Sequence, residues 1–231
     1  MKYTKHVTDR SRERAREDYL KAVYQLGRTA PVRSTDLARY LGISRSSVSQ
    51  FRRILERDGY VHRSANRLDT LRLTERGLGL AVRMVRRHRI LETFLHASLD
   101  VPLELVHAEA ERIEHVVSDD IVLRLAHMLG RPECDSHGHR IPYDDVPEPV
   151  ESTVRLCEVP VGTRVVVTSI DDRDPEIVKF LAAARVLPGL RAAVRQSGMR
   201  VVLESGGAPD TVELTQGAAR AVHCAVVSAH A

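Results

Sequence analysis

Apolar side chains recur at helical spacing along the first hundred residues, with one short interruption. Residues 13–28 place apolar positions three to four apart, a pattern that predicts an amphipathic helix. Two shorter helices are expected over 35–40 and 45–58, and a longer one from about 74 to 96. Residues 60–73 instead hold two short β-rich stretches around a polar tip, which predicts a hairpin.

The two short helices are separated by a turn that contains Gly42. Ser34 and Ser44 stand where N-cap residues are expected, one before each helix. This order is typical of a helix-turn-helix, and the following hairpin would complete a winged helix. An αα-hairpin followed by an unrelated β-hairpin would show the same order of elements and stays open as an alternative.

The rest of the chain changes from helical to β character. Residues 103–117 and 119–129 predict a second helical pair, the latter capped by Ser118, and the Pro- and Gly-containing segment 131–150 predicts a linker. From about 153, short β-branched runs predict a small SH3-like barrel with one helix. The predicted fold is therefore mainly α with small β parts, divided at 1–75, 76–150 and 151–231.

The charge of the chain is unevenly distributed. Residues 1–90 hold 22 Lys and Arg against 9 Asp and Glu, and the remainder holds 13 against 22. A basic block joined to an acidic remainder favours a polyanion-binding module, although a merely solvated basic surface would look the same.

The chain carries neither a long apolar run nor a cysteine framework. There is no run of 18 apolar residues and no secretory signal at the start, so no membrane association is expected. The three cysteines, Cys134, Cys157 and Cys224, are widely spaced and odd in number, which fits a reducing cytoplasm.

The most specific chemistry lies in the segment HAEAERIEH. His107, Glu111, Glu114 and His115 would project from one face of a helix, and His88 and Glu92 form an i, i+4 pair on the preceding helix. Imidazole nitrogens and carboxylate oxygens without thiolate suit Mn(II) or Fe(II) better than structural zinc. The competing interpretation is a solvated helix face, with these side chains satisfied by water or Arg112.

Enzymatic functions find little support in the sequence. The motifs HExxH, GxGxxG, Walker A and GxSxG are absent, so no small-molecule substrate is expected. A metal-dependent hydrolase remains an alternative because His and Glu ligands also serve hydrolysis, but it would not explain a basic helix-turn-helix.

At these residues the chain resembles the metal-dependent repressors of the diphtheria toxin repressor and manganese transport regulator family. The matching stretches are EDYLKAVYQL, SSVSQFRRILERDGYV, LRLTERG, RRHRILETFL, VHAEAERIEHVVSDD and HGHRIP. The resemblance implies a DNA-binding winged helix, a helical metal-binding and dimerisation domain, and a C-terminal SH3-like (FeoA-like) domain. It also implies a homodimer that binds palindromic operator half-sites on double-stranded DNA.

The resemblance further implies two metal positions. One would use His88, Glu92 and His107; the other would use Asp18 with Glu111, Glu114 and His115. Iron-type members have methionine and cysteine where Asp18 and Glu111 stand, so the resemblance favours Mn(II), with an Fe(II)-dependent repressor as the alternative. Other divalent ions, such as Zn, Co, Ni or Cd, are expected to occupy such sites in vitro.

Three segments of the chain depart from the family pattern or allow more than one interpretation. Lys21 stands where some manganese-type members have a further glutamate, and in the segment SIDDRD either Asp171 or Asp172 could replace the usual ligands of the SH3-like domain. Cys134, His137 and His139 could bind zinc, but the resemblance favours a structural turn.

The expected DNA contacts lie on the helix-turn-helix and the wing. Gln50 is the best candidate for reading a base, since glutamine pairs bidentately with adenine. Side chains of the recognition helix would hold phosphates: Ser44, Arg45, Ser46, Ser47, Ser49 and Arg53. Ser34 and Thr35 would present a helix N-terminus to a phosphate. Arg63 and Arg67 of the wing would also contact phosphate, with simple solvation as the alternative.

Overall fold

The computed structural model describes residues 2–28, 30–62, 69–144, 152–196, 200–204 and 211–227, with side chains from residue 11 onward. The chain forms two compact units, Met1–Arg87 with Pro142–Val150, and His88–Ile141 with Glu151–Ala231. We call them the N-terminal and the C-terminal unit. Helix α4 (Glu75–Leu99) contributes its first half to the N-terminal unit and its second half to the C-terminal unit.

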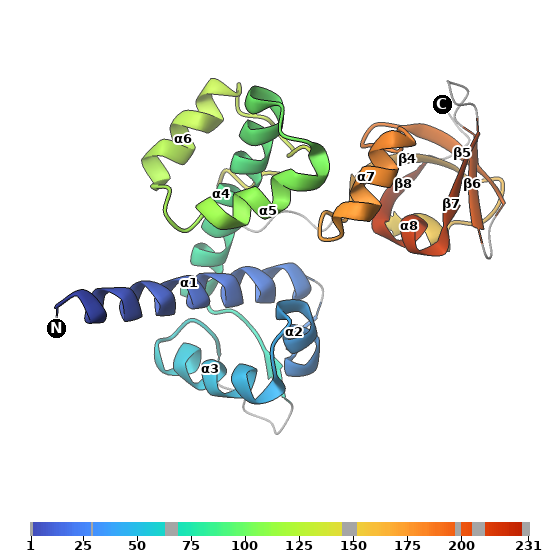
Figure 1. Ribbon diagram of the computed structural model, residues 1–231. Helices are drawn as coiled ribbons and strands as arrows, with labels where there is room; N and C mark the ends of the chain where they lie inside the picture. The colour runs from blue at the N-terminus through green and yellow to red at the C-terminus, as the bar shows by residue number, and fades with distance from the viewer. Residues whose placement is uncertain are drawn as a thin grey trace. The chain divides into compact units, whose positions relative to one another are not determined.

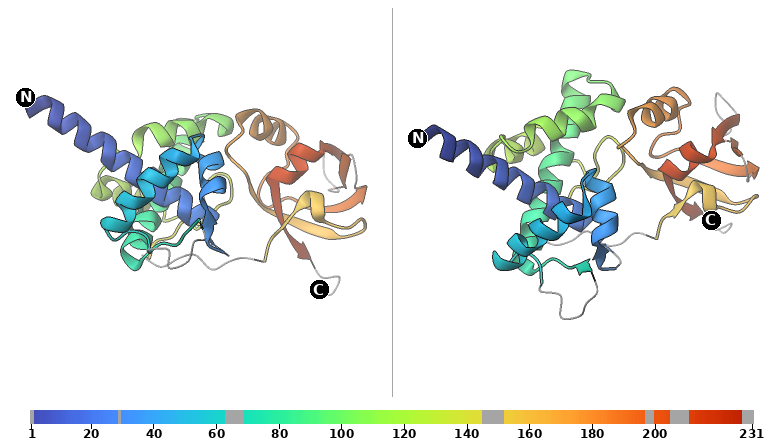
Figure 2. Two further views of the ribbon diagram at one scale, coloured as in Figure 1. Left: turned by 90° about the horizontal axis from the view of Figure 1, so that it is seen from below. Right: turned by 60° about the horizontal axis from the view of Figure 1, so that its bottom comes forward.

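The N-terminal unit is built from the first three helices. In Figures 1 and 2, α2 (Ser34–Leu41) and α3 (Arg45–Arg57) lie beside α1 (Lys2–Leu26). The expected start of the first helix at residue 13 is wrong, because α1 already begins at Lys2. Its first turns are polar, so the apolar pattern that marks the later turns could not reveal them.

The predicted helix-turn-helix is confirmed by α2 and α3. Gly42 ends α2 with φ of 66°, a left-handed conformation that favours glycine, and Ser44 caps α3 by accepting a 3.1 Å hydrogen bond from the Ser47 amide. The expected Ser34 cap is wrong. Arg33 is the N-cap of α2 and makes no capping bond, whereas the buried Ser34 hydroxyl donates to Asp69 Oδ1 at 2.7 Å.

A two-stranded sheet joins the strand before α2 to the strand after α3, and the ends of the expected hairpin are bridged. Strand β1 (Val32–Arg33) pairs antiparallel with β2 (Thr70–Leu71), and Val61 bridges to Leu73. The expected hairpin tip lies outside the described residues. The core of this unit gathers apolar side chains from every element, among them Leu20, Leu37, Val48, Leu55, Leu71 and Val82.

Helices α5 (Leu103–Ile113) and α6 (Asp119–Met128) form the helical pair of the C-terminal unit. Ser118 caps α6 as predicted, accepting from the Ile121 amide at 3.4 Å. The expected extension of α5 to residue 117 is wrong, because α5 ends at Ile113 and Glu114 and His115 lie in the turn that follows. No helix in the described part of the chain is both long and apolar enough to span a membrane.

The β part of the C-terminal unit is, within the described residues, a six-stranded antiparallel sheet, as expected for a small SH3-like domain. Its strand order is β3-β8-β4-β5-β6-β7, and alternating residues of β4 and β7 are buried, as half-buried strands require. Its strands are β3 (Val154–Arg155), β4 (Arg164–Ile170), β5 (Arg191–Gln196), β6 (Arg200–Glu204), β7 (Thr211–Thr215) and β8 (Val222–Val227).

Short helices cover this sheet and join it to the helical pair. They are the 3₁₀ helix Leu156–Glu158, α7 (Pro175–Ala183) and α8 (Gln216–Ala221), of which only α7 was predicted. Helix α7 contacts α5, and buried Val106 and Ala110 of α5 belong to the same hydrophobic core as Val178 and Leu181 of α7. This packing brings the loop between β4 and α7, which contains Asp172, close to α5.

Candidate metal centre

Four ligand-type side chains from three segments converge in the C-terminal unit. His88 and Glu92 lie one turn apart on α4, His107 lies on α5, and Asp172 follows β4. Glu92 Oε1 lies 2.9 Å from His88 Nε2 and 3.1 Å from His107 Nδ1, and His107 Nδ1 lies 3.4 Å from Asp172 Oδ2. We call these four residues the inner cluster. One ligand atom from each lies within 4.8 Å of all the others, the spacing of groups that can share one cation.

Burial and opposite charges set the protonation of the inner cluster. Burial would raise the pKa of Glu92, but the charge of His88 and hydrogen bonds from His107 and His88 hold it well below the usual range. Burial would lower the pKa of His107, yet hydrogen bonds and charge from Asp172 and Glu92 raise it to about 11. The positive charge of protonated His107 therefore partly neutralises the carboxylates of Glu92 and Asp172. A metal cation bound at this point would replace that proton.

The donor chemistry of the inner cluster fits a divalent cation. It offers two imidazole nitrogens and two carboxylates and no sulfur, a set suited to Mn(II) or Fe(II). Glu92 is fully buried, and its Oε2 has no hydrogen-bond partner within the described ranges. An unpaired buried carboxylate oxygen is costly in a protein that binds nothing there and is satisfied by coordination.

Asp135 and His137 extend this site, and sequence reasoning did not select this pair. Asp135, His137 and Glu92, all buried, place ligand atoms within 4.8 Å of one another. His137 Nδ1, like Glu92 Oε2, has no hydrogen-bond partner among the described residues, whereas Asp135 Oδ2 lies 3.4 Å from His139 Nδ1. The segment CDSHGH drew attention through Cys134, but the signal that mattered was Asp135 two residues before His137.

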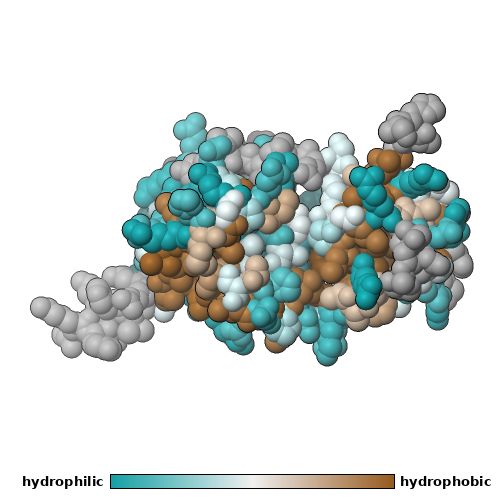
Figure 3. Space-filling view, turned by 90° about the horizontal axis from the view of Figure 1, so that it is seen from above, coloured by the Kyte–Doolittle hydropathy of each residue, from teal (hydrophilic) through white to brown (hydrophobic). Residues whose placement is uncertain are grey.

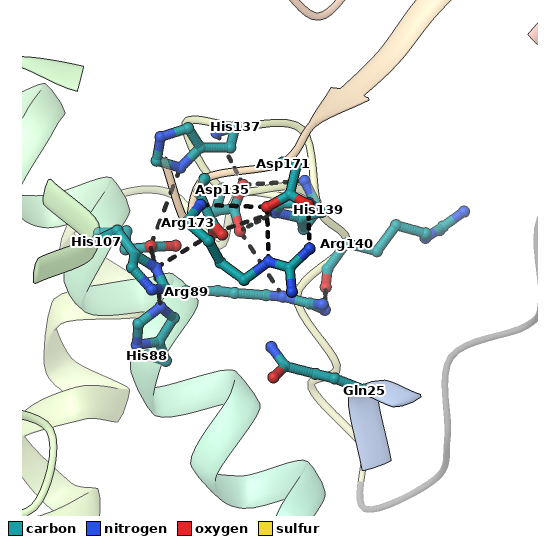
Figure 4. A network of polar contacts seen from close by, with 12 residues as sticks. Gln25, His88, Arg89, His107, Asp135, His137, His139, Arg140, Asp171 and Arg173 are labelled. Carbon is teal, nitrogen blue, oxygen red and sulfur yellow. Dashed lines mark hydrogen bonds and ion pairs between the residues drawn. The ribbon is translucent and has the colours of Figure 1, made fainter. Parts of the chain in front are cut away.

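The loop that carries these two residues is held by its own backbone and by Arg89. Asp135 Oδ1 accepts hydrogen bonds from the amides of His137 and His139, both at 2.9 Å. The buried Arg89 donates to the Arg140 carbonyl, and its Nε lies 3.7 Å from Asp135 Oδ2 (Figure 4). The expected structural turn is thus present, and it also directs His137 toward Glu92, 4.0 Å away.

Gly138 is required by the tight approach of this loop to the sheet. Its φ is 88°, which favours glycine, and a Cβ here would collide with the carbonyl oxygen of Thr168. His139, beside it, would have its pKa lowered by burial, but the charge and hydrogen bond of Asp135 raise it to about 9. Figure 4 shows His88, His107 and His137 gathered on one side of this network and Arg89, Asp135 and His139 on the other.

The residues expected at the second metal position occupy different environments. Glu114 is fully buried and accepts from His88 Nδ1 at 2.7 Å, while its Oε1 lies 3.5 Å from His115 Nε2. Glu111 is exposed, with Oε1 3.6 Å from His107 Nε2. The expectation that all four residues from His107 to His115 share one helix face is therefore wrong in detail, because the helix ends before Glu114.

Asp18, the remaining expected ligand, belongs to α1 in the N-terminal unit, where it is half-buried. Its meeting with the residues after α5 stays a prediction. Lys21, one turn further along α1, is only 7% exposed. We call Asp18, Glu111, Glu114 and His115 the split set, because its members are divided between the two units.

The candidate DNA contacts are mostly open to solvent. Gln50 is exposed on α3, as are Arg45, Ser46, Ser47 and Arg53, while Ser49 and Thr35 are half-buried. The hydroxyl of the exposed Ser44 caps α3 by accepting a hydrogen bond from the Ser47 amide. Ser34 is wrong as a phosphate contact, because it is 1% exposed and bonded to Asp69. Arg63 and Arg67 lie outside the described residues.

Three family models match the chain in consecutive segments. The N-terminal DNA binding domain of iron dependent repressors matches residues 13–67, and their metal binding and dimerisation domain matches 74–143. A FeoA domain matches residues 154–226. Together they cover the helix-turn-helix, the helices of the inner cluster and the C-terminal sheet.

Individual proteins align over most of the chain. The iron-dependent repressor IdeR of Mycobacterium tuberculosis is 35% identical over 204 residues, which are 81% of this chain and 87% of that protein. The diphtheria toxin repressor of Corynebacterium glutamicum is 34% identical over 219 residues, covering 89% and 93%. A manganese-dependent transcriptional repressor solved in complex with manganese is 33% identical with a TM-score of 0.81, covering 91% of this chain and 99% of its own.

Proposed function

We propose a function from the following premise: the chain belongs to the family of iron-dependent repressors that includes the diphtheria toxin repressor. It is a metal-dependent DNA-binding repressor with a dimerisation domain, and not an enzyme. Within that family, our proposal is a cytoplasmic homodimer that responds to manganese(II) and binds palindromic operators. The alternative is an iron(II)-dependent repressor of the same architecture.

The inner cluster is the observation that carries this proposal. Its donors are nitrogen and oxygen only, Asp172 is half-buried, and the fully buried Glu92 keeps an oxygen without a hydrogen-bond partner among the described residues. Asp18 and Glu111 extend the oxygen-rich character to the split set, where sulfur ligands would favour softer or more strongly binding metals. One relative of similar fold is a manganese-dependent repressor, while IdeR, at similar identity, is iron-dependent. Because Asp18 and Glu111 both offer oxygen ligands, we favour manganese(II) over iron(II).

The residues of the inner cluster would hold the cation and fasten the SH3-like domain. His107 is held protonated by Asp172 and Glu92, and it would have to release that proton to serve as a ligand. A cation held by these residues would supply the positive charge that the two carboxylates otherwise take from His107. Asp172 would tie the loop after β4 to α4 and α5, so that three segments of the C-terminal unit become one rigid frame.

The split set would carry the signal to DNA. Asp18 lies on α1, which packs into the same core as the helix-turn-helix, and Glu111, Glu114 and His115 lie in the C-terminal unit. Shared coordination would restrict the angle between the units. In a dimer, this fixes the spacing of the two recognition helices, which must match half-sites about one DNA turn apart. Metal then favours the DNA-competent state, and DNA favours metal binding by the same factor.

Exposed apolar side chains on the helical pair offer a dimerisation surface. Leu105 on α5 is 48% exposed, and Ile121, Leu123 and Met128 on α6 are between 47% and 62% exposed. The face shown in Figure 3 carries brown apolar patches among hydrophilic side chains. Exposed apolar patches on a helical domain are typical of protein–protein contacts. We assign the exposed apolar side chains of α5 and α6 to contact with the second subunit.

Operator binding with and without metal tests the proposal. A duplex selected from random DNA in the presence of Mn(II) serves as probe, and its affinity is measured in metal-free buffer, in Mn(II), and anaerobically in Fe(II). We expect tight binding in Mn(II) at free concentrations where Fe(II) gives less. Equal affinities with and without metal would rule out metal gating, and stronger activation by Fe(II) would select the alternative.

A further inference from the structure

A shallow pocket on the outer face of the C-terminal sheet collects three arginines. Its volume is about 530 Å³, and its lining includes Arg164 of β4 and Arg191 and Arg195 of β5. The last 141 residues of the chain are acidic overall, with 13 Lys and Arg against 22 Asp and Glu. Residues 151–231 alone hold 9 Lys and Arg against 9 Asp and Glu, so this pocket gathers a third of the basic side chains of the SH3-like domain.

Strand register explains why the three side chains surround one point. Residues 191, 193 and 195 of β5 alternate with buried Ala192 and Val194, so all three face outward. Ala193 pairs with Arg164 across the β4–β5 ladder, and Val166 pairs with Arg191. Ala193, with only a methyl group, thus lies between Arg191 and Arg195 and opposite Arg164, which leaves the floor of the pocket low.

The charge of this pocket is only partly balanced. Glu204 of β6, which pairs with Ala193 from the other side, lines the pocket and is bound by Arg195. Arg164 and Arg191 form no ion pair within the part of the chain that the structure describes. Gly162, whose amide donates to the Val194 carbonyl at 2.7 Å, borders the pocket without a side chain. The site is therefore open above, with two uncommitted guanidinium groups on its walls.

We propose that this pocket binds a compact phosphoryl anion, such as inorganic phosphate, pyrophosphate or the terminal phosphate of a small ester. Guanidinium groups form paired, charge-assisted hydrogen bonds with phosphoryl oxygens, and several of them around one point suit a single tetrahedral dianion. A DNA backbone would instead be met by charges spaced along a line. The repressor would thus carry an anion site on the FeoA domain, separate from both metal positions.

The test uses the full-length protein without metal, because phosphates chelate Mn(II). Backbone amide resonances are followed while inorganic phosphate, pyrophosphate or glycerol phosphate is added at constant ionic strength, with chloride as reference. We expect saturable shifts at Gly162, Ala193 and their neighbours. The R164Q/R191Q variant should weaken binding about tenfold or more, since two charge-assisted interactions are lost.

The R200Q variant is the matched control. Arg200 is an exposed arginine of the same sheet that pairs with Glu213 at 2.8 Å and does not line the pocket. It should leave phosphate binding unchanged, and unchanged melting temperatures would show that all variants fold. A preference for pyrophosphate or glycerol phosphate over inorganic phosphate would identify the source of the phosphoryl group.

Three results would overturn the proposal. One is the absence of saturable shifts beyond those that chloride causes. Another is equal phosphate binding by wild type and R164Q/R191Q. The third is binding of a random-sequence DNA duplex that shifts these same resonances while the phosphates do not, which would assign the arginines to nucleic acid. None of these outcomes depends on whether the protein is activated by manganese.

Discussion

The inner cluster and the split set use the same kinds of ligand but differ in where their members lie. His88, Glu92, His107 and Asp172 all belong to the C-terminal unit and come together as that unit packs. The split set takes Asp18 from one unit and its other members from the other. A site inside one unit is assembled by folding, whereas a site divided between two units can report whether they are joined. We therefore expect the inner cluster to govern metal affinity and the split set to govern DNA binding.

The two sets are nevertheless in contact through their histidines and glutamates. His88 presents Nε2 to Glu92 and donates from Nδ1 to Glu114, a member of the split set. His107 likewise faces Glu92 with Nδ1 and Glu111 with Nε2. Hydrogen bonds of this kind orient a histidine ligand and fix its tautomer. A substitution in one set should therefore also alter metal binding by the other set. The effect on the other set should be smaller than the effect on the substituted set.

The largest effect is expected from Asp18→Ala, which removes the only member of the split set on α1. Metal stimulation of operator binding should fall by about 100-fold, toward the upper end of common coupling free energies. Metal binding to the inner cluster should change little. Fluorescence anisotropy of an operator duplex measures the first quantity and calorimetric Mn(II) titration the second. Glu17→Gln, at the half-buried neighbouring position, is the control. Unchanged metal stimulation of operator binding in Asp18→Ala would contradict the role proposed for the split set.

The next effect concerns Glu92, which both His88 and His107 contact. Glu92→Gln should weaken the tightest Mn(II) binding by tens of fold, since changes even outside the ligand sphere commonly cost about 10- to 100-fold. The pKa of His107 should also fall, because a carboxylate that raises it is gone. NMR titration of the histidine rings follows the second change. Glu109→Gln on α5 provides a control that leaves the cluster intact, and an unaltered Mn(II) affinity in Glu92→Gln would remove the inner cluster from the proposal.

Local signals explain the part of this architecture that could be predicted. Ser44 and Ser118 cap α3 and α6 because an N-cap acts on its own first turn, and the ligand candidates on α4 and α5 follow from helical spacing. Ser34 shows the limit of such reasoning. A serine before a helix is a good cap by sequence, but here a partner 35 residues away, Asp69, takes its hydroxyl.

Contacts distant in sequence account for what was missed. Asp135 and His137 join Glu92 only because Arg89, Gly138 and the hydrogen bond from the Ile170 amide to the His137 carbonyl hold their loop against α4 and the sheet. Asp172 could not be separated from Asp171 by sequence. The structure separates them, since Asp172 lies by His107 while Asp171 pairs with Arg173. The start of α1 holds only Tyr3 and Val7 among polar residues, too weak an apolar pattern to predict a helix there.

A third effect is the pH dependence of metal binding by the inner cluster. The metal-free pKa of His107 is raised to about 11, so this imidazole is still protonated at neutral pH and must release its proton to bind. Affinity should rise about tenfold per pH unit between about pH 7 and 8.5, where an ordinary histidine would already be neutral. Calorimetry in buffers of different ionisation enthalpy should count about one proton released per ion from this group.

The same shift predicts the opposite trend for the metal-free protein. A folded-state pKa above the unfolded value contributes stability that is complete below about pH 6.5 and is lost as pH rises through the folded value. Stability without metal should therefore decline between those limits while metal affinity increases. A pH-independent Mn(II) affinity over this range would show that His107 is not a ligand.

A smaller effect is expected when the SH3-like domain loses its contribution. Asp172→Asn keeps the side chain's shape but weakens a ligand, and should reduce Mn(II) affinity by about fivefold to tenfold. Asp171→Asn is the matched control, because the adjacent carboxylate pairs with Arg173 instead. Similar losses of Mn(II) affinity in both variants would indicate a general electrostatic effect of these carboxylates. Unchanged Mn(II) affinity in both would mean that only residues of α4 and α5 bind the metal.

The smallest effect separates a manganese-type site from a zinc site around Cys134. The thiol of this residue belongs to no group of ligand atoms found among the described residues, whereas Asp135 and His137 approach Glu92. Cys134→Ser should therefore leave Mn(II) affinity within about twofold of wild type, while His137→Gln should weaken it several-fold if the loop adds a ligand. Zn(II) binding by the same variants is measured in parallel. If Cys134→Ser abolishes Zn(II) binding and His137→Gln leaves Mn(II) binding unchanged, the loop is a separate zinc site. In that case the manganese ligands are the four residues of the inner cluster alone.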